Sequence, residues 1–331
     1  MHTITHPDAT WIPYELKYMG YKRYLKKHEV NKGTVLSEYA GKPMLSCGEF
    51  NEKLYNAITE GIPYMVSRIG GNEMNVIAYT YRNRYFPYRT DARADNIRDL
   101  CVGAGFFPRE VDYGEQFTDL MSSRIEKADI LGIWTTYMEE WFIHRYAPLA
   151  TSTWFNNLGP WVQMAAEGGE RVWTKALQNK KVLVIHPFED SIVSQYKKRE
   201  QLFTGKFEGM LPEFELKTFK ALQSMGGEGI EGFGTWFDAL YYMQDEIDKI
   251  DYDVAIIGCG AYGLPLAAHV KGMGKCAIHM GGTVQLLFGI RGKRWDNAGS
   301  MYTDMMTDAW VRPLPSEIPE VMKKLENGCY C

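Results

Sequence analysis

The sequence lacks an excess of positive charge. Its 331 residues carry a net charge of −4, whereas proteins that bind nucleic acid in general show a basic excess. Cysteines are also few: there are six, and none belongs to a C-x-x-C pair. Scattered cysteines of this kind favour a reducing compartment. These absences argue against a nucleic-acid-binding function and predict a cytoplasmic protein.

Long apolar runs and linkers are missing as well. The N-terminal segment has neither the charged start nor the apolar core of a signal peptide. The uncharged stretch Val254–Val270 holds three glycines and a proline, which suits a strand, a turn and a helix better than a membrane span. No linker rich in proline or serine divides the chain. We therefore predict one domain at residues 49–315, after an N-terminal helical extension (1–48) and before a C-terminal tail (316–331).

What the sequence does contain is a strand–turn–helix–strand unit in residues 253–295. Val254–Ile257 is a short β-branched run, Leu264–Lys271 has a helical pattern, and Cys276–Met280 is a second strand. The glycines between them form a G-x-G-x-x-G motif, whose backbone can approach a diphosphate at a helix N-terminus. The candidate phosphate-binding residues of the two turns are Gly258, Gly260, Tyr262, Gly263, Gly281 and Gly282.

The acidic residue that completes a dinucleotide site is absent. A site for NAD needs Asp or Glu at the end of the second strand, and this chain carries His279 there and no acid before Asp296. The motif alone is also compatible with a tight turn that binds no ligand. A basic cluster downstream, Arg291, Lys293 and Arg294, suits a phosphorylated ligand; its alternative interpretation is a solvated surface turn.

Polar residues follow two other predicted strands. Ile62–Ser67 leads into a second glycine turn that carries Arg68 and Glu73, and Val182–Ile185 leads to His186 and Asp190. Ligands of open α/β sheets bind at the carboxyl ends of the strands. We therefore expect Arg68, Asp190 and Gly260 at one edge of the sheet.

Strands alternate with helices along the chain. This pattern predicts an α/β fold with a mostly parallel, doubly wound, Rossmann-like sheet that has helices on both faces. The predicted strands are Tyr64–Ser67, Ile130–Trp134, Val182–Ile185, Val254–Ile257 and Cys276–Met280, with a further candidate at Phe214–Thr218.

The two glycine turns together resemble those of the GT-D type glycosyltransferases, a Rossmann-like family of bacterial sugar transferases. The resemblance rests on Ser67–Glu73 and Ile257–Gly263, with support from the H-P-F-E-D strand end and the segment Trp310–Pro313. It covers roughly residues 50–315. It implies a GT-D-like fold and a function in the biosynthesis of bacterial surface polysaccharides or glycoproteins.

The resemblance implies a hexosyltransferase that uses a nucleotide diphosphate sugar, with UDP as the expected nucleotide. Its acceptor would be a cell-surface glycan, a glycoprotein or a lipid-linked glycan. The implied catalytic residues are Arg68 and Glu73, with His186 and Asp190 as further candidates. In the family an Asp and a Glu hold Mn²⁺ or Mg²⁺ on the diphosphate. Gly71 replaces that Asp here, so Glu73 is the single expected metal ligand and metal dependence is in question.

Three alternatives remain open on the sequence alone. The same glycine turn serves NADP-dependent oxidoreductases and S-adenosylmethionine methyltransferases, and a non-catalytic nucleotide-binding protein would explain the missing Asp. The basic segment at residues 14–32 predicts either a solvated helix or peripheral contact with the inner face of an anionic membrane. A homo-oligomer is compatible with every alternative.

Overall fold

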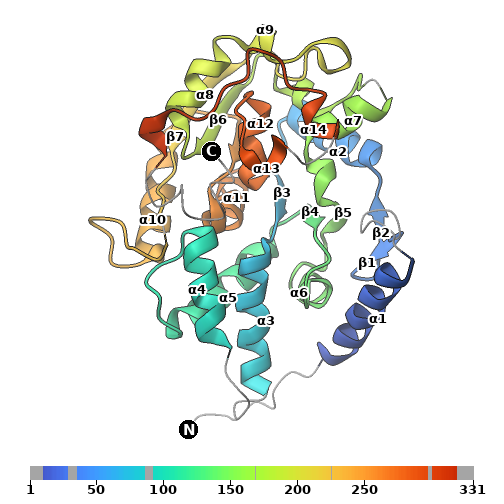
Figure 1. Cartoon of the computed structure of the whole chain (residues 1–331), viewed down its shortest axis with the longest axis vertical. Coiled ribbons are helices and arrows are strands. Elements are labelled where there is room, and N and C mark those ends of the chain that lie inside the picture. Colours follow the sequence, from blue (N-terminus) through green and yellow to red (C-terminus); the bar gives the residue numbers. More distant parts are fainter. Residues whose placement is uncertain are drawn as a thin grey trace.

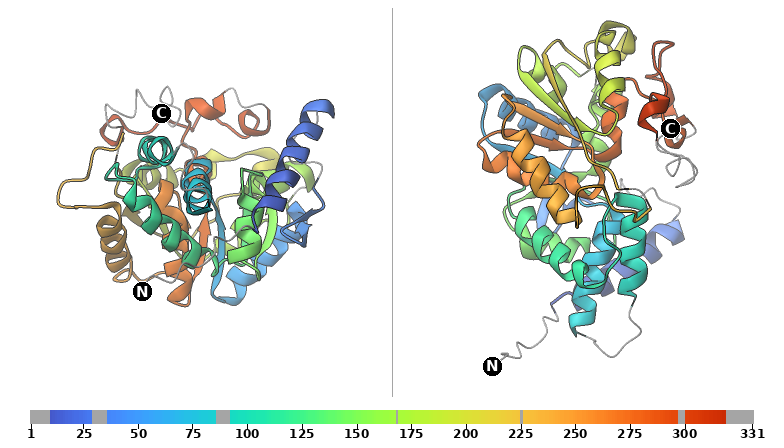
Figure 2. Two further views of the ribbon diagram at one scale, coloured as in Figure 1. Left: turned by 90° about the horizontal axis from the view of Figure 1, so that it is seen from below. Right: turned by 90° about the vertical axis from the view of Figure 1, so that its left-hand side faces the viewer.

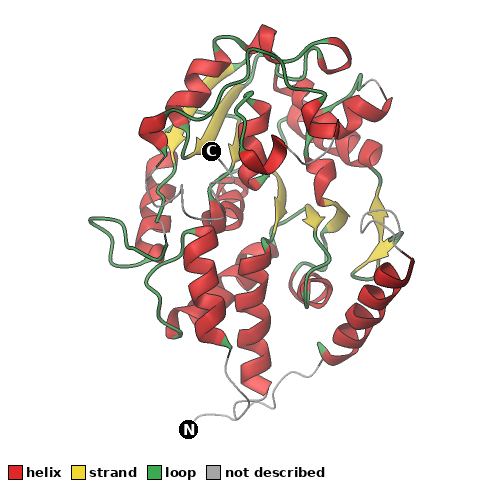
Figure 3. Cartoon of the chain, in the orientation of Figure 1, coloured by secondary structure: helices red, strands yellow, loops and turns green. Residues whose placement is uncertain are grey.

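The sheet at the centre of the molecule contains nine strands in the described part of the chain, which comprises residues 10–28, 36–85, 92–167, 169–224, 226–296 and 300–318 of the computed structural model. Its strand order is β1-β2-β5-β4-β3-β9-β8-β6-β7, and every neighbouring pair is parallel except β1 and β2 (Figures 1 and 3). The strands are β1 (Glu38–Tyr39), β2 (Lys42–Leu45), β3 (Tyr64–Arg68), β4 (Ile130–Ile133), β5 (Thr151–Trp154), β6 (Lys181–His186), β7 (Glu215–Lys220), β8 (Val254–Ile257) and β9 (Cys276–His279).

The five predicted strands are confirmed as β3, β4, β6, β8 and β9, and each end lies within one residue of its predicted position. Successive residues of a strand point to opposite faces, and this sheet is buried on both. Val182 and Val184 of β6 pack into one hydrophobic core, whereas Leu183 and Ile185 pack into the other. A strand that is apolar on both sides is typical of a parallel sheet covered by helices.

Helices cover both faces of the sheet (Figures 1 and 2). The first face is covered by α1 (Ile12–His28), α3 (Gly71–Tyr85), α4 (Arg93–Ala104), α5 (Asp112–Ile125), α6 (Glu139–Tyr146), α10 (Trp236–Ile247) and α11 (Gly263–Gly272). The second is covered by α2 (Cys47–Glu60), α7 (Pro160–Glu167), α8 (Glu189–Tyr196), α9 (Arg199–Leu202), α12 (Val284–Leu287), α13 (Lys293–Asp296) and α14 (Ser300–Thr303). The predicted doubly wound α/β class is thus observed. No helix in the described ranges is long and apolar enough to span a bilayer.

The sequence of α2 explains both of its ends. The hydroxyl of Ser46 accepts the N–H of Glu49, and the Glu49 carboxylate accepts the N–H of Ser46 at 2.8 Å. This reciprocal capping satisfies two otherwise unpaired donors of the first turn. The helix stops at Gly61, which has a φ of +68°, a conformation that favours glycine.

Three short strands were not predicted. The strand β5 is made of Thr, Ser, Thr and Trp, and β2 contains a proline, so neither shows a β-branched apolar run. Polar hydroxyls are tolerated here because they find partners: Thr153 Oγ1 donates to the carbonyl of Leu45 at 2.9 Å. Residues 38–45 were assigned to the helical extension, yet they form β1 and β2 at the edge of the sheet.

The predicted C-terminal tail also contributes to the fold. Glu317 is buried, and its carboxylate accepts the N–H groups of Asp190 and Ser191 at 2.8 and 3.2 Å. A carboxylate at a helix N-terminus satisfies unpaired donors and interacts favourably with the helix dipole. Glu317, which is far away in the sequence, thus caps the N-terminus of α8 (Glu189–Tyr196). Residues 319–331 lie outside the described part.

Candidate functional site

A cleft of about 530 Å³ opens at the carboxyl ends of five parallel strands. This volume is in the usual range for small-molecule sites. Residues after β3, β4, β5, β8 and β9 all contribute, together with α4, α13 and α14. The lining residues are Arg68, Gly70, Gly71, Asn72, Glu73, Gly103, Ala104, Trp134, Thr136, Phe155, Gly260, Gly282, Thr283, Arg294, Trp295 and Tyr302. The cleft therefore brings together Arg68, Glu73, Gly260, Gly282 and Arg294, which the sequence selected separately.

Arg68 ends β3 and faces the cleft. Its Cζ lies 5.6 Å from the centroid of the Trp134 ring, a cation–π distance. On another side it packs against Gly281, where φ is +64° and a Cβ would lie 2.7 Å from Arg68 Cζ. Only glycine leaves room for the guanidinium at that position. No hydrogen bond or ion pair joins Arg68 to another described residue, so its N–H groups are available to a ligand.

Glu73 lies in the first turn of α3, with 6% of its surface exposed. Its carboxyl group packs over Gly70, where any side chain would overlap it. Burial raises the pKa of Glu73, and the positive charge of Arg68 offsets part of this effect. A carboxyl group with a raised pKa in a cleft is a suitable proton acceptor or donor near neutral pH.

Aromatic rings form one wall of the cleft. Trp134 and Phe155 are stacked, with 3.3 Å between ring centroids and an interplanar angle of 17°. Trp295 and Tyr302 contribute further rings from α13 and α14. Such surfaces bind bases and sugars by stacking. The sequence did not select Trp134, Phe155 or Tyr302, because stacking between residues of different strands has no local sequence pattern.

Glu139 does not line the cleft, but it holds the loop that carries Trp134 in place. Its buried carboxylate accepts the backbone N–H groups of Trp134 and Thr136 and the hydroxyl of Tyr39 at 2.9–3.2 Å. It thereby holds a loop in which Thr135 has an unfavourable φ of +55°. Burial raises the pKa of Glu139 to about 7, against the lowering effect of these hydrogen bonds. No sequence pattern indicates this role of Glu139.

The glycines of the G-x-G-x-x-G motif mainly allow neighbouring parts of the chain to pack closely against this turn. A Cβ at Gly258 would lie 2.6 Å from the carbonyl oxygen of Gly281, and one at Gly263 would overlap the ring of His279. Gly260 has a φ of +59°, and the carbonyl oxygen of Ala104 would lie 2.6 Å from its Cβ. Only Gly260 of the three lines the cleft. We predicted a diphosphate across Gly258–Gly263, but the end of α4 covers the turn at Gly260.

Several other predicted residues lie away from the cleft surface. Tyr262 is buried and stacks on Trp236, with 4.8 Å between centroids. His186 is buried, its Nδ1 accepts the N–H of Phe188 at 3.0 Å, and burial lowers its pKa to about 3. Asp190 lies in the first turn of α8, and its backbone N–H donates to Glu317. Arg68, Asp190 and Gly260 all follow or end parallel strands at the carboxyl edge of the sheet, but only Arg68 and Gly260 line the cleft; His186 and Asp190 do not.

The predicted basic cluster divides into two parts. Arg294 lines the cleft, whereas Arg291 and Lys293 do not. Arg291 pairs with Asp296, with 3.2 Å between Nη2 and Oδ1, and Arg312 pairs with the same carboxylate. An ion-paired side chain outside the cleft is a poor candidate for binding a phosphate there.

The described residues of the cleft do not form a metal site. Among the described residues that line the cleft, Glu73 is the single acidic side chain, and the positive charge of Arg68 already offsets part of the rise in its pKa. Nowhere in the described ranges do three or more His, Cys, Asp or Glu side chains group as metal ligands. Hard cations need several oxygen donors, so the residues present do not fit the Mn²⁺ or Mg²⁺ site that the resemblance implied.

Comparisons with known proteins give little further information. No protein family model and no curated protein matches the chain. The chain is similar to a solved structure described as selenomethionine-substituted domain of unknown function 1792 (DUF1792), with 11% identity, a TM-score of 0.35, and coverage of 82% of this chain and 98% of that one. A TM-score this low supports no conclusion about fold or function. The α/β class rests on the sheet itself.

Proposed function

We propose that the chain is a glycosyltransferase that binds a nucleoside diphosphate sugar in the cleft and transfers the sugar to a glycan or glycoprotein acceptor. The observation that carries the proposal is the position of Arg68. Its guanidinium faces a cleft at the carboxyl ends of parallel strands, next to a buried carboxyl group and an aromatic wall. A cation with free N–H donors is suited to a phosphate group.

In this proposal Arg68 and Arg294 contact the diphosphate, which replaces the predicted position across Gly258–Gly263. The departing nucleoside diphosphate develops negative charge in the transition state, and two guanidinium groups stabilise that charge without a metal. The rings of Trp134, Phe155, Trp295 and Tyr302 provide stacking surfaces for the base and the sugar. UDP is the nucleotide that we expect.

Glu73 is the proposed catalytic base. The acceptor hydroxyl attacks the anomeric carbon, and its proton passes to the Glu73 carboxylate. The bond between the anomeric carbon and the phosphate oxygen breaks, and the nucleoside diphosphate leaves with the bonding electrons. Burial raises the pKa of Glu73, which strengthens the ionised carboxylate as a base.

A ligand panel read by thermal unfolding tests the proposal. A ligand at about 100 times its dissociation constant stabilises the native state by about 2.7 kcal/mol. We expect UDP, another nucleoside diphosphate or their sugar conjugates to raise Tm, and NADPH and S-adenosylmethionine to leave it unchanged. A response to NADPH or S-adenosylmethionine alone would instead support an oxidoreductase or a methyltransferase. The second measurement is slow hydrolysis of the donor sugar without acceptor.

A further inference from the structure

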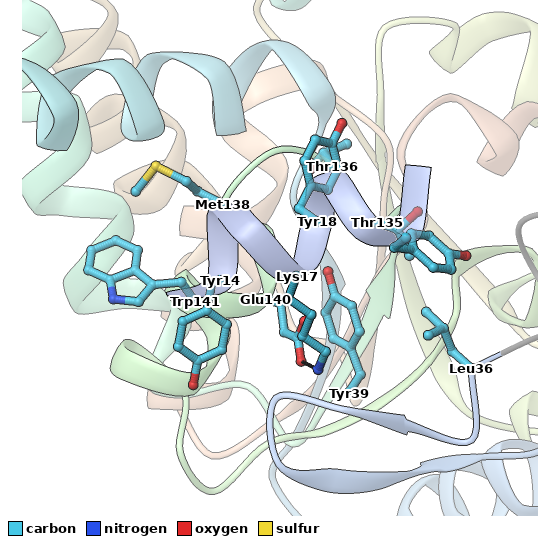
Figure 4. Close-up of a pocket in the computed structure, with 11 residues that line it drawn as sticks. Tyr14, Lys17, Tyr18, Leu36, Tyr39, Thr135, Thr136, Met138, Glu140 and Trp141 are labelled. Atoms are coloured by element: carbon cyan, nitrogen blue, oxygen red, sulfur yellow. Dashed lines mark hydrogen bonds and ion pairs between the residues drawn. The ribbon is translucent and has the colours of Figure 1, made fainter. Parts of the chain in front are cut away.

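The helix α1 is attached to the body of the protein by one face. Leu25 is buried, as is Trp11 just before the helix, and Tyr14, Tyr18 and Tyr21 line a small pocket of about 50 Å³ (Figure 4). The pocket is closed by Tyr39, by the loop at Thr135–Thr136 and by an ion pair between Lys17 and Glu140. These contacts fix the rotation of the helix about its axis, and therefore fix which side chains point outward.

The outward face of α1 combines apolar and cationic side chains. Leu16, Met19 and Tyr24 are 63%, 41% and 45% exposed. Met19, Arg23 and Lys27 follow Leu16 at intervals of three and four residues, so all four share one face. Lys22 and Lys26 are exposed at its flank. Figures 1 and 2 show the helix at the periphery of the molecule.

The charge on this helix is opposite to that of the whole protein. Residues 12–28 contain five Lys and Arg side chains and a single Glu, while the chain has a net charge of −4. Of these cations, Lys17 pairs with Glu140 and Lys22 lies over the Tyr18 ring. Arg23, Lys26 and Lys27 form no ion pair with another described residue. If this face contacted only water, its three large exposed apolar side chains would contribute nothing to stability.

We propose that the outward face of α1 docks the protein on an anionic lipid surface. Basic side chains interact with the negative surface potential, and the apolar side chains enter the boundary between headgroups and acyl chains. The inference goes beyond the proposed function, but the two are connected in space. Thr136 lines both the pocket beneath α1 and the cleft, so a docked helix holds the cleft close to the lipid.

Sedimentation of the full chain with lipid vesicles tests the proposal. We expect binding to vesicles of phosphatidylserine and phosphatidylcholine, and much weaker binding to phosphatidylcholine alone. Raising the salt from about 0.1 M to about 1 M shortens the screening length from about 10 Å to about 3 Å, and binding should fall accordingly. Equal binding to both vesicle types, or none to the anionic ones, overturns the proposal.

Two matched triple variants identify the surface. Arg23→Gln, Lys26→Gln and Lys27→Gln together should lower the partition coefficient about a hundredfold, since each cation near the surface is worth about a fivefold change. Lys197→Gln, Lys198→Gln and Lys206→Gln remove the same charge from exposed positions elsewhere and should have little effect. Equal losses would show that net charge alone controls binding and would contradict a specific face.

The apolar contribution is tested by Leu16→Gln with Met19→Gln. We expect this variant to lose the binding that remains at high salt, while its Tm stays within a few degrees of the unaltered protein because both side chains are exposed. Analytical ultracentrifugation without lipid provides the opposing outcome. If the chain self-associates and these variants abolish the association, a second copy rather than lipid covers the face.

Discussion

Arg68 lies over the ring of Trp134, with 5.6 Å between Cζ and the ring centroid. Arg68 is the last residue of β3 and Trp134 directly follows β4, its parallel neighbour, so the register of the two strands sets their separation. Trp134 is also stacked with Phe155, which follows β5, the next strand in the sheet. Residues at the ends of three adjacent strands thus form one wall of the cleft, and the guanidinium of Arg68 belongs to it.

Gly263 should be required for packing. In Gly263→Ala the added methyl group overlaps the ring of His279, and overpacking of this kind costs about 1–3 kcal/mol. Gly272→Ala in the same helix meets nothing within 4 Å and should be neutral or slightly stabilising. Urea unfolding of both variants measures the difference. Equal stabilities would show that the glycine is not needed for close packing.

Glu73→Gln should separate binding from catalysis. The amide keeps the shape of the side chain and removes the base, so we expect nearly unchanged nucleotide affinity and a loss of turnover of about 10²–10⁴-fold. Because burial raises the pKa of Glu73, the rate of the unaltered protein should rise with pH through a value above the ordinary range of a carboxyl group. A variant with normal turnover would remove Glu73 from the mechanism.

Glu139 should make stability depend on pH. Its pKa of about 7 in the native state lies above the ordinary 4.5, so the native state binds more protons and its stability falls as the pH rises between these values. The difference corresponds to about 3 kcal/mol. In Glu139→Gln this loss should be absent, whereas Glu60→Gln at an exposed position should behave like the unaltered protein. Urea unfolding at about pH 4 and about pH 8, one below and one above both pKa values, measures the difference.

Gly71→Asp should create metal dependence. A Cβ at Gly71 meets nothing within 4 Å, and an acidic residue is favourable in the first turn of α3. The new carboxylate would join Glu73 as a second oxygen ligand. Titration of Mn²⁺ at a fixed nucleotide concentration should show tighter binding by the variant than by the unaltered chain. Equally tight binding by both proteins would show that Glu73 already forms a metal site.

The sequence predicted the central strands well because they are buried on both faces and are therefore apolar and largely β-branched. It could not predict β5, whose Ser152 and Thr153 are polar yet buried; the Thr153 hydroxyl is satisfied by a hydrogen bond that only the tertiary structure provides. The edge strands β1 and β2 are short and carry no apolar pattern either.

The site was predicted only in part. A motif such as Gly258–Gly263 arises both where a backbone approaches a phosphate and where it packs closely against another part of the chain, and sequence cannot distinguish the two. Here the approach is to Gly281, His279 and Ala104. For this reason Gly260→Val would not isolate ligand binding, because the side chain would collide with the carbonyl of Ala104 at a φ that favours glycine.

The proposed diphosphate site is tested most directly by titration calorimetry with UDP on three arginine variants. Arg68→Gln and Arg294→Gln remove cations that line the cleft, and Arg291→Gln removes one that pairs with Asp296 outside it. Each charge-assisted contact with a phosphate is worth about 1.5–3 kcal/mol, so each of the first two variants should bind about 10- to 100-fold more weakly, while Arg291→Gln binds normally. Unchanged affinity in Arg68→Gln, or an equal loss in Arg291→Gln, would contradict the proposed diphosphate site.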